Sequence, residues 1–263
     1  MHIKICEKYV IHLCDDLITG YKDGKFNDAC EPYIRHVLNP KLQSQLSRCA
    51  WCWEKLVQNV RSKATVESVI DLFGGVGRSA VIIQNELEPL EHTIYDYSKV
   101  MVEHLFRLFG WRIDIQVHQL DTYQALLDGL DVNADLVVFD HNHFTLRSLF
   151  KDDIVTQVLA QVFACNPLFV QLVDLALPYL HLNKAQYEKL SGYAINTFDD
   201  YINALSAIIE ERWGYGITFV AHYSNIAAIL LEPLNVCPDI IETIDARDHP
   251  ESLNYWRITD GII

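Results

Sequence analysis

The sequence predicts an α/β protein with a doubly wound, mostly parallel seven-stranded sheet that ends in an antiparallel hairpin. Short runs of β-branched and aliphatic residues alternate with segments of helical character, as in sheets whose parallel strands are linked by helices. A glycine-rich turn joins the first of these strands to its helix. Two later strands, 216–222 and 225–232, are separated only by Tyr223 and Ser224, which predicts the hairpin.

The first strand is expected at residues 66–70 and ends on Asp71, before a glycine cluster that leads into a helix at 79–87. Gly75 and Gly77 have no Cβ atoms, so the loop can take unusual dihedral angles and admit a ligand close to the main chain. The unpaired N–H groups at the start of the following helix would face that ligand. This stretch therefore predicts a site that cradles a nucleotide.

The alternation of strand and helix continues through the middle of the chain. Four more short apolar runs are expected as strands, at 93–95, 111–117, 135–140 and 168–173. Helices are expected at 98–110, at 146–163 and from 198 onwards, and a shorter one opens at Asp121. Thr197, with Asp200 three residues later, is a typical helix N-cap.

The chain divides into a helical extension at 1–64, the α/β core at 65–236 and an acidic tail at 237–263 that offers no motif. Within the extension a helix starts at Pro40, and its apolar residues recur at alternating steps of four and three. They are Leu42, Leu46, Cys49, Trp53, Leu56 and Val60. This stripe predicts packing across the core, because fewer than about three heptads is short for a coiled coil. A seam with a second copy or with a partner protein is the alternative.

The composition indicates a folded, acidic protein. At 263 residues, half of them apolar, the chain is long enough to bury a full core. Its net charge of −14 is unevenly spread: residues 1–64 carry 10 Lys and Arg against 7 Asp and Glu, and the remainder carries 11 against 28. The acidic body would repel polyanions, so non-specific binding of nucleic acid has no electrostatic support.

The sequence also bears on location. No run approaches the roughly 18 to 20 apolar residues that cross a bilayer, and the first residues lack the apolar core of a signal peptide. We therefore expect a cytoplasmic protein that does not associate with a membrane. The seven cysteines are expected as reduced thiols rather than as a disulfide framework.

The spacing Asp71-x-Phe73-x-Gly75-x-Gly77 resembles the first motif of class I S-adenosylmethionine-dependent methyltransferases. In that family the acid helps to hold the methionine end of the cofactor, whose ammonium and sulfonium groups suit a carboxylate. The glycines also fit the dinucleotide fingerprint, with Asp96 about twenty residues on for a ribose. A dinucleotide-binding sheet usually continues with parallel strands, however, whereas βα units closed by a hairpin resemble the methyltransferase core.

The resemblance implies that S-adenosyl-L-methionine is the cofactor and that the glycine motif binds it, through Asp71, Phe73, Gly75 and Gly77. It also implies that Asp96 takes the ribose hydroxyls and that Asp121 lies near the adenine amino group. Both acids have a structural alternative, since Asp96 could instead cap the helix that follows it and Asp121 is well placed as a helix N-cap.

The end of the fourth strand, at 140–145, is where this fold commonly places its catalytic groups. The resemblance implies that Asp140, Asn142 and His143 orient or deprotonate the methyl acceptor. A histidine, with an unperturbed pKa near 6.5, suits the removal of one proton near neutral pH. The Asp-Pro-Pro-Tyr signature of nucleic-acid amino methyltransferases and the Pro-Cys of cytosine C5 enzymes are absent from this position, although the glycine motif is most similar to nucleic-acid methyltransferases.

No metal site is expected. Catechol-type O-methyltransferases have metal-binding acids where this chain has Asp140 and Asp174, but Leu175 stands in place of that family's metal-binding Asn. Cys49-x-x-Cys52 lacks a second pair at zinc spacing and is expected to be two buried thiols on a helix.

Together these features predict an enzyme that transfers a methyl group from S-adenosylmethionine, with nucleic acid slightly favoured over a small molecule or a protein as acceptor. The alternative is a catalytically silent structural or binding subunit with the methyltransferase fold, because a fold does not guarantee an activity. A nicotinamide-linked oxidoreductase is a more distant alternative.

Overall fold

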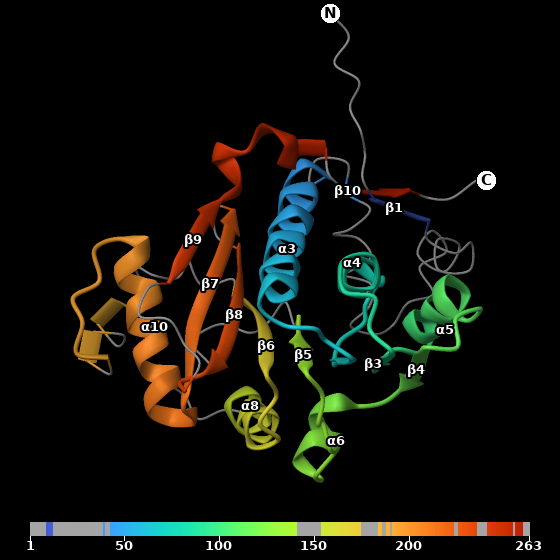
Figure 1. Cartoon of the computed structure of the whole chain (residues 1–263), viewed down its shortest axis with the longest axis horizontal. Coiled ribbons are helices and arrows are strands. Elements are labelled where there is room, and N and C mark those ends of the chain that lie inside the picture. The colour runs from blue at the N-terminus through green and yellow to red at the C-terminus, as the bar shows by residue number, and fades with distance from the viewer. Residues whose placement is uncertain are drawn as a thin grey trace, which may run out of the picture.

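The computed structural model describes residues 9–12, 39, 43–140, 154–174, 184–185, 188–189, 191–223, 226–235, 241–254 and 256–259. Within these residues an eight-stranded sheet lies between helices on both of its faces (Figure 1). A separate two-stranded sheet pairs segments that lie far apart in the sequence. None of the helices in the described part of the chain has the length and apolar character needed to span a bilayer.

The strands of the main sheet are β2 Ser68–Asp71, β3 Glu91–Asp96, β4 Ile115–Gln119, β5 Leu136–Phe139, β6 Phe169–Asp174, β7 Tyr215–Tyr223, β8 Ile226–Pro233 and β9 Glu242–Asp245. Their order across the sheet is β4-β3-β2-β5-β6-β8-β7-β9, and β8 runs antiparallel to both of its neighbours. The mostly parallel sheet and its antiparallel hairpin are confirmed. The strand order reverses between β2 and β5, which is where open α/β sheets bind their ligands.

The predicted number of strands, seven, is wrong, because β9 adds an eighth within the segment that we expected to be an acidic tail. It pairs in parallel with β7, with Glu242 opposite Phe219 and Asp245 opposite His222. Its residues are exposed or half-buried, so this edge strand lacks the apolar pattern from which a strand can be predicted.

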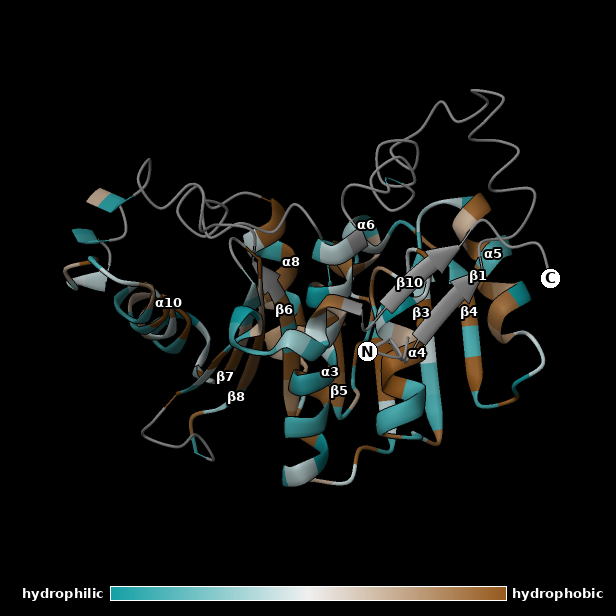
Figure 2. Cartoon of the chain, turned by 90° about the horizontal axis from the view of Figure 1, so that it is seen from above, coloured by the Kyte–Doolittle hydropathy of each residue, from teal (hydrophilic) through white to brown (hydrophobic). Residues whose placement is uncertain are grey.

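The main helices are α3 Gln43–Lys63, α4 Arg78–Glu86, α5 Lys99–Phe109, α6 Thr122–Leu127, α8 Ile154–Ala164 and α10 Phe198–Trp213. One core cluster joins α3 and α4 to one face of the sheet, and a second joins α6, α8 and α10 to the other. Figure 2 shows the hydrophobic strands between these two layers. The predicted N-cap of α10 is confirmed. Thr197 Oγ1 accepts a hydrogen bond from the Asp200 N–H, and Asp200 Oδ2 accepts one from the Thr197 N–H.

The apolar stripe of the extension faces the core. Leu46, Cys49, Trp53, Leu56 and Val60 are all at most 4% exposed, whereas Leu42 lies outside the described residues. The helix that carries them, α3, packs against α4, β7 and β8. The stripe therefore packs across the α/β core, as its short length predicted.

The extension also contains a strand, so its predicted helical character is only part of its structure. β1, Tyr9–His12, pairs in parallel with β10, Trp256–Thr259, with Val10 opposite Arg257. Aromatic and β-branched residues in β1 favour a strand. The partner strand, however, lies nearly the whole chain away, and no local pattern can indicate such a pairing.

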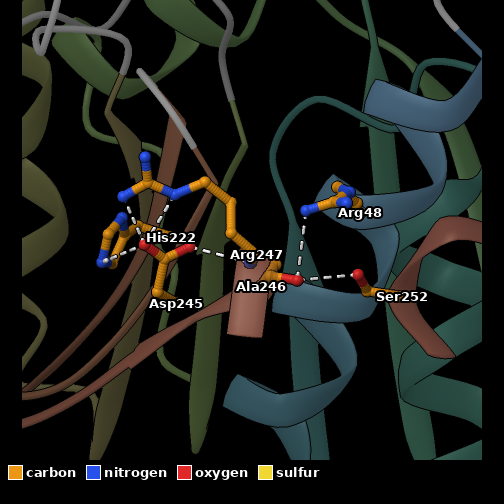
Figure 3. A network of polar contacts seen from close by, with 6 residues as sticks. All are labelled: Arg48, His222, Asp245, Ala246, Arg247 and Ser252. Atoms are coloured by element: carbon orange, nitrogen blue, oxygen red, sulfur yellow. Dashed lines mark hydrogen bonds and ion pairs between the residues drawn. The ribbon is translucent and has the colours of Figure 1, made fainter. Parts of the chain in front are cut away.

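The segment after β9 is anchored to α3 through backbone oxygens. It forms two short 3₁₀-helices, η3 Ala246–Asp248 and η4 Pro250–Asn254. The Ala246 carbonyl accepts hydrogen bonds from Arg48 Nη1 of α3 at 3.3 Å and from Ser252 Oγ at 2.9 Å (Figure 3). Ser47 Oγ of α3 donates a further hydrogen bond of 2.9 Å to the Ser252 carbonyl. Because the Arg48 and Ser47 contacts cross to α3, and Ala246 and Ser252 are fully buried, the segment is part of the folded core.

Two predicted boundaries differ from the structure. The strand expected at 111–117 begins only at Ile115, because Trp111 and Ile113 are exposed in a turn that the Arg112–Asp114 ion pair closes. Because these two residues are apolar, the sequence pattern placed the start of the strand too early. Of the helix expected at 146–163, residues 146–153 lie outside the described part of the chain, and α8 occupies the rest.

Candidate functional site

The glycine loop connects β2 to α4 at the point where the strand order reverses. Gly75 and Gly77 both have positive φ angles, of 51° and 83°, which L-amino acids with side chains rarely adopt. The loop is closed by hydrogen bonds from the Gly74 N–H to the Tyr95 carbonyl and from the Gly77 N–H to the Gly74 carbonyl, both 2.8 Å. A Cβ atom on Gly77 would lie 2.9 Å from a methyl group of Leu108, so this glycine also permits close packing of α4 on α5.

Phe73 supports the loop from inside the protein. Its ring packs edge-on against Phe139 of β5, with centroids 5.0 Å apart, and against Tyr123 of α6 at 5.6 Å. Thr122 Oγ1 donates a hydrogen bond of 3.0 Å to the Leu72 carbonyl. The loop is therefore fixed to both β5 and α6.

Asp96, at the end of β3, binds the glycine loop directly. Its Oδ2 accepts a 2.8 Å hydrogen bond from the Gly75 N–H, and its Oδ1 accepts one of the same length from the Ser98 N–H at the start of α5. The N-cap of α5 is Ser98, without a side-chain cap hydrogen bond, so Asp96 binds the N–H of the N-cap residue and does not itself cap the helix. It also holds Gly75 in its left-handed conformation.

Asp121 is the N-cap of α6. Its Oδ1 accepts a hydrogen bond of 3.2 Å from the Gln124 N–H, and its side chain is exposed at the same edge of the sheet as Asp96. Capping uses one oxygen and leaves the carboxylate accessible to solvent.

Asp140 follows β5 and lies in the centre of a polar cluster. Its Oδ2 accepts three hydrogen bonds: from Trp53 Nε1 at 2.8 Å, from Ser79 Oγ at 2.9 Å and from Arg78 Nη2 at 3.2 Å. The Arg78 guanidinium also lies 4.5 Å from the centre of the Trp53 ring, within the range of a cation–π contact. Three donors from two helices thus converge on one oxygen.

Asp71, at the end of β2, is completely buried beside this cluster. Its Oδ1 accepts a 3.1 Å hydrogen bond from the Phe73 N–H. Burial raises the pKa of Asp71 to about 8, and the negative charge of Asp140 adds to the effect, while the Phe73 N–H and Arg78 oppose it. Near neutral pH the Asp71 carboxyl is therefore mostly protonated in the free protein.

Two acceptor oxygens of this cluster, Asp71 Oδ2 and Asp140 Oδ1, are buried and have no hydrogen-bond partner among the described residues. Buried oxygens of this kind are costly, and at functional sites they commonly mark the place of a missing donor. A positively charged ligand with N–H donors would lower the pKa of Asp71, so that the carboxyl becomes ionised, and its donors would then satisfy both oxygens. In the described part of the chain, no group of three His, Cys, Asp or Glu side chains is arranged to hold a metal ion.

The structure brings together some predicted site residues and adds others. Asp71, Asp96 and Asp140 surround the glycine loop, whereas Asn142 and His143 lie outside the described residues. Sequence reasoning missed the role of three donors to Asp140, namely Trp53, Arg78 and Ser79. Arg78 and Ser79 follow the last glycine of the motif directly, which is a signal in the sequence. Trp53 carried no such signal in the sequence, because its spacing is that of the other apolar residues of the helix.

No protein-family model and no curated protein sequence matches this chain. Among solved structures, Trm1 from Pyrococcus horikoshii in complex with S-adenosyl-L-methionine matches with a TM-score of 0.50 and 10% identity, over 75% of this chain and 57% of that one. The plantazolicin methyltransferase BpumL in complex with SAH matches with a TM-score of 0.49 and 14% identity, over 83% and 95% of the two chains. The putative methyltransferase yhhF from Escherichia coli has a TM-score of 0.47 and 10% identity, over 69% and 83%.

The similarity to the Trm1 structure shows the fold of this chain, which is the α/β fold that the sequence led us to expect from its resemblance to class I methyltransferases. The chain spans little more than half, 57%, of the length of the Trm1 chain that it matches.

Proposed function

We propose that this protein is an S-adenosylmethionine-dependent methyltransferase. The observation that carries the proposal is the pair of buried acceptor oxygens on Asp71 and Asp140, beside a glycine loop at the reversal of strand order. A cationic cofactor with N–H donors fits such a pair better than a pyrophosphate, because two carboxyl groups repel a polyanion. The similarity to the fold of Trm1, whose structure contains S-adenosyl-L-methionine, supports the same cofactor.

Residues of the glycine loop and of two neighbouring strand ends would each bind a different part of the cofactor. Asp71, Phe73, Gly75 and Gly77 would hold the methionine end, because these glycines keep side chains away from the turn. Asp96 would take the ribose hydroxyls, because its carboxylate lies beside the loop and already accepts hydrogen bonds from the Gly75 and Ser98 N–H groups there. Asp121, exposed at the same edge of the sheet, would lie near the adenine amino group.

When bound, S-adenosylmethionine would supply the methyl group, whose bond to sulfur breaks as the electron pair of the acceptor forms the new bond and the sulfur retains the old pair. The protein needs to hold the acceptor in line with that bond and to exclude water. The groups proposed to orient the methyl acceptor are Asp140, Asn142 and His143. His143 would accept the proton that the methyl acceptor loses. We favour nucleic acid slightly as the acceptor, on the basis of the glycine motif, over a small molecule or a protein.

Calorimetry tests the cofactor. We expect S-adenosylmethionine and S-adenosylhomocysteine to bind and NAD to bind more weakly or not at all. Absence of heat with both sulfur compounds at millimolar concentration, or tighter binding of NAD, would contradict the proposal.

Transfer of a tritiated methyl group to RNA, DNA, protein and metabolite fractions tests the activity. On the labelled fraction, Asp140→Ala and His143→Ala should each lower turnover at least about tenfold, and His143→Ala should leave the affinity for S-adenosylhomocysteine within about threefold, as expected when transition-state contacts are lost. A protein that binds the cofactor but labels no fraction would instead be the catalytically silent subunit.

A further inference from the structure

Asp140 accepts hydrogen bonds from two helices, α4, which follows the glycine loop directly, and α3, which lies far from it in the sequence. Arg78 and Ser79 belong to the first turn of α4, which the loop itself leads into. Trp53 belongs to α3, and its indole N–H reaches Asp140 across 87 positions of the sequence. The Trp53 side chain is 1% exposed, so this donor is enclosed within the core.

The hydrogen bonds from the three donors are distributed unequally over the two oxygens of Asp140. All of them bind Oδ2, while Oδ1 is buried and has no hydrogen-bond partner among the described residues. Rotation of the carboxylate would break contacts to two helices at once. The direction of Oδ1 is thus set by groups that bind only Oδ2.

The same contacts fix Trp53 in turn. Arg78 packs on its ring while both side chains bind the same oxygen, so the ring, the guanidinium and the carboxylate form one unit. A tryptophan that served only as packing on α3 would not need its N–H at this place. The chain offers a comparison, since Trp51 is equally buried on the same helix and its ring packs against His249, with centroids 4.6 Å apart.

We infer that Trp53 is a positioning residue, which together with Ser79 and Arg78 clamps Asp140 Oδ2 so that Oδ1 faces the methyl group that is transferred. The inference rests on the proposed function. It extends the site to α3, which carries no part of the cofactor motif, and it assigns the indole N–H rather than the apolar ring as the group that matters.

The position of Oδ1 can be measured without the methyl acceptor. Sinefungin is an analogue of the cofactor in which a carbon bearing an amine replaces the methylated sulfur, whereas S-adenosylhomocysteine has neither amine nor methyl group there. An oxygen that faces this position accepts a hydrogen bond from the protonated amine. We therefore expect the wild-type protein to bind sinefungin at least about tenfold more tightly than S-adenosylhomocysteine, measured by calorimetry.

The variants separate positioning from packing. Trp53→Phe removes the N–H and keeps an aromatic ring, and Ser79→Ala removes a second donor with a smaller change of volume. Each should lower the preference for sinefungin at least about threefold while leaving the affinity for S-adenosylhomocysteine within about twofold. Asp140→Asn should lower it further, and Trp51→Phe, the matched control, should leave it unchanged.

The failures are distinguishable. If the wild-type protein binds S-adenosylhomocysteine but Trp53→Phe and Ser79→Ala both keep the full preference for sinefungin, the inference is overturned and the proposed function stands. The inference is likewise overturned if Trp51→Phe lowers the preference as much as Trp53→Phe, because loosened packing would then explain both. If the wild-type protein binds neither ligand, the proposed function fails and the inference fails with it.

Discussion

The Asp71→Asn variant should lose less stability than the wild-type protein as pH rises. The folded protein keeps a proton on Asp71 up to about pH 8, because burial and Asp140 raise its pKa to that value from 3.8. The unfolded chain releases the same proton near pH 4. The stabilising contribution of the protonated carboxyl is therefore complete at low pH and is lost as pH rises from about 4 through 8.

The size of the effect follows from the two pKa values. Between pH 6.5 and pH 8 the unfolded carboxyl is already ionised, while the folded one changes from almost fully protonated to half protonated. The free energy of unfolding of the wild-type protein should therefore fall by about 1.5 kcal/mol more over this interval than that of Asp71→Asn. The asparagine side chain keeps an oxygen for the Phe73 N–H, so the loop retains its contact.

Urea unfolding of both proteins at the two pH values provides the measurement. Other titrating groups are the same in the two proteins and cancel in the comparison. Asp121→Asn, which removes an exposed carboxylate from the same edge of the sheet, controls for the change in net charge. If wild type and Asp71→Asn lose the same free energy within about 0.5 kcal/mol, Asp71 is ionised in the folded protein and our account of the cluster is wrong.

Three further predictions concern neighbouring residues. Asp96→Ala should weaken binding of S-adenosylhomocysteine by about 1.5 to 3 kcal/mol, the scale of hydrogen bonds to a charged group, and unchanged affinity in calorimetry would leave Asp96 only its contacts to the loop. Gly77→Ala should lower the free energy of unfolding by about 1 to 3 kcal/mol in urea, because φ is 83° and the new Cβ meets Leu108; an unchanged midpoint would contradict this. Glu54→Gln should raise the Tm relative to wild type at pH 9 but not at pH 5, because burial, with a smaller effect of Glu86, raises the pKa of Glu54 to about 8. Equal Tm differences at both pH values would exclude that cause.

The features that the sequence could predict are those with a local cause. The glycine loop follows from residues within one turn, the capping of α10 from Thr197 and Asp200, and the hairpin from two apolar runs around a short turn. Each is decided by neighbours in the chain, so its pattern is visible in a short window.

The features that escaped prediction depend on contacts between distant residues. β9 is stabilised as a strand by its pairing with β7 rather than by its own acidic residues. The clamp on Asp140 needs Trp53, whose place in an apolar stripe predicts burial but not the polar use of its N–H. A periodic pattern tells which face of a helix is inside, and it does not tell which atoms meet there.

The pairing of β1 with β10 has a consequence for the order in which the protein folds. Tyr9 lies opposite Trp256, so the pairing closes a loop that contains almost all of the described chain. The entropy lost in closing so long a loop is compensated only after the intervening sheet has brought the two segments near each other. The two-stranded sheet is therefore expected to form after the core, and because the described residues give it four pairs in register, it is also expected to open before the core does.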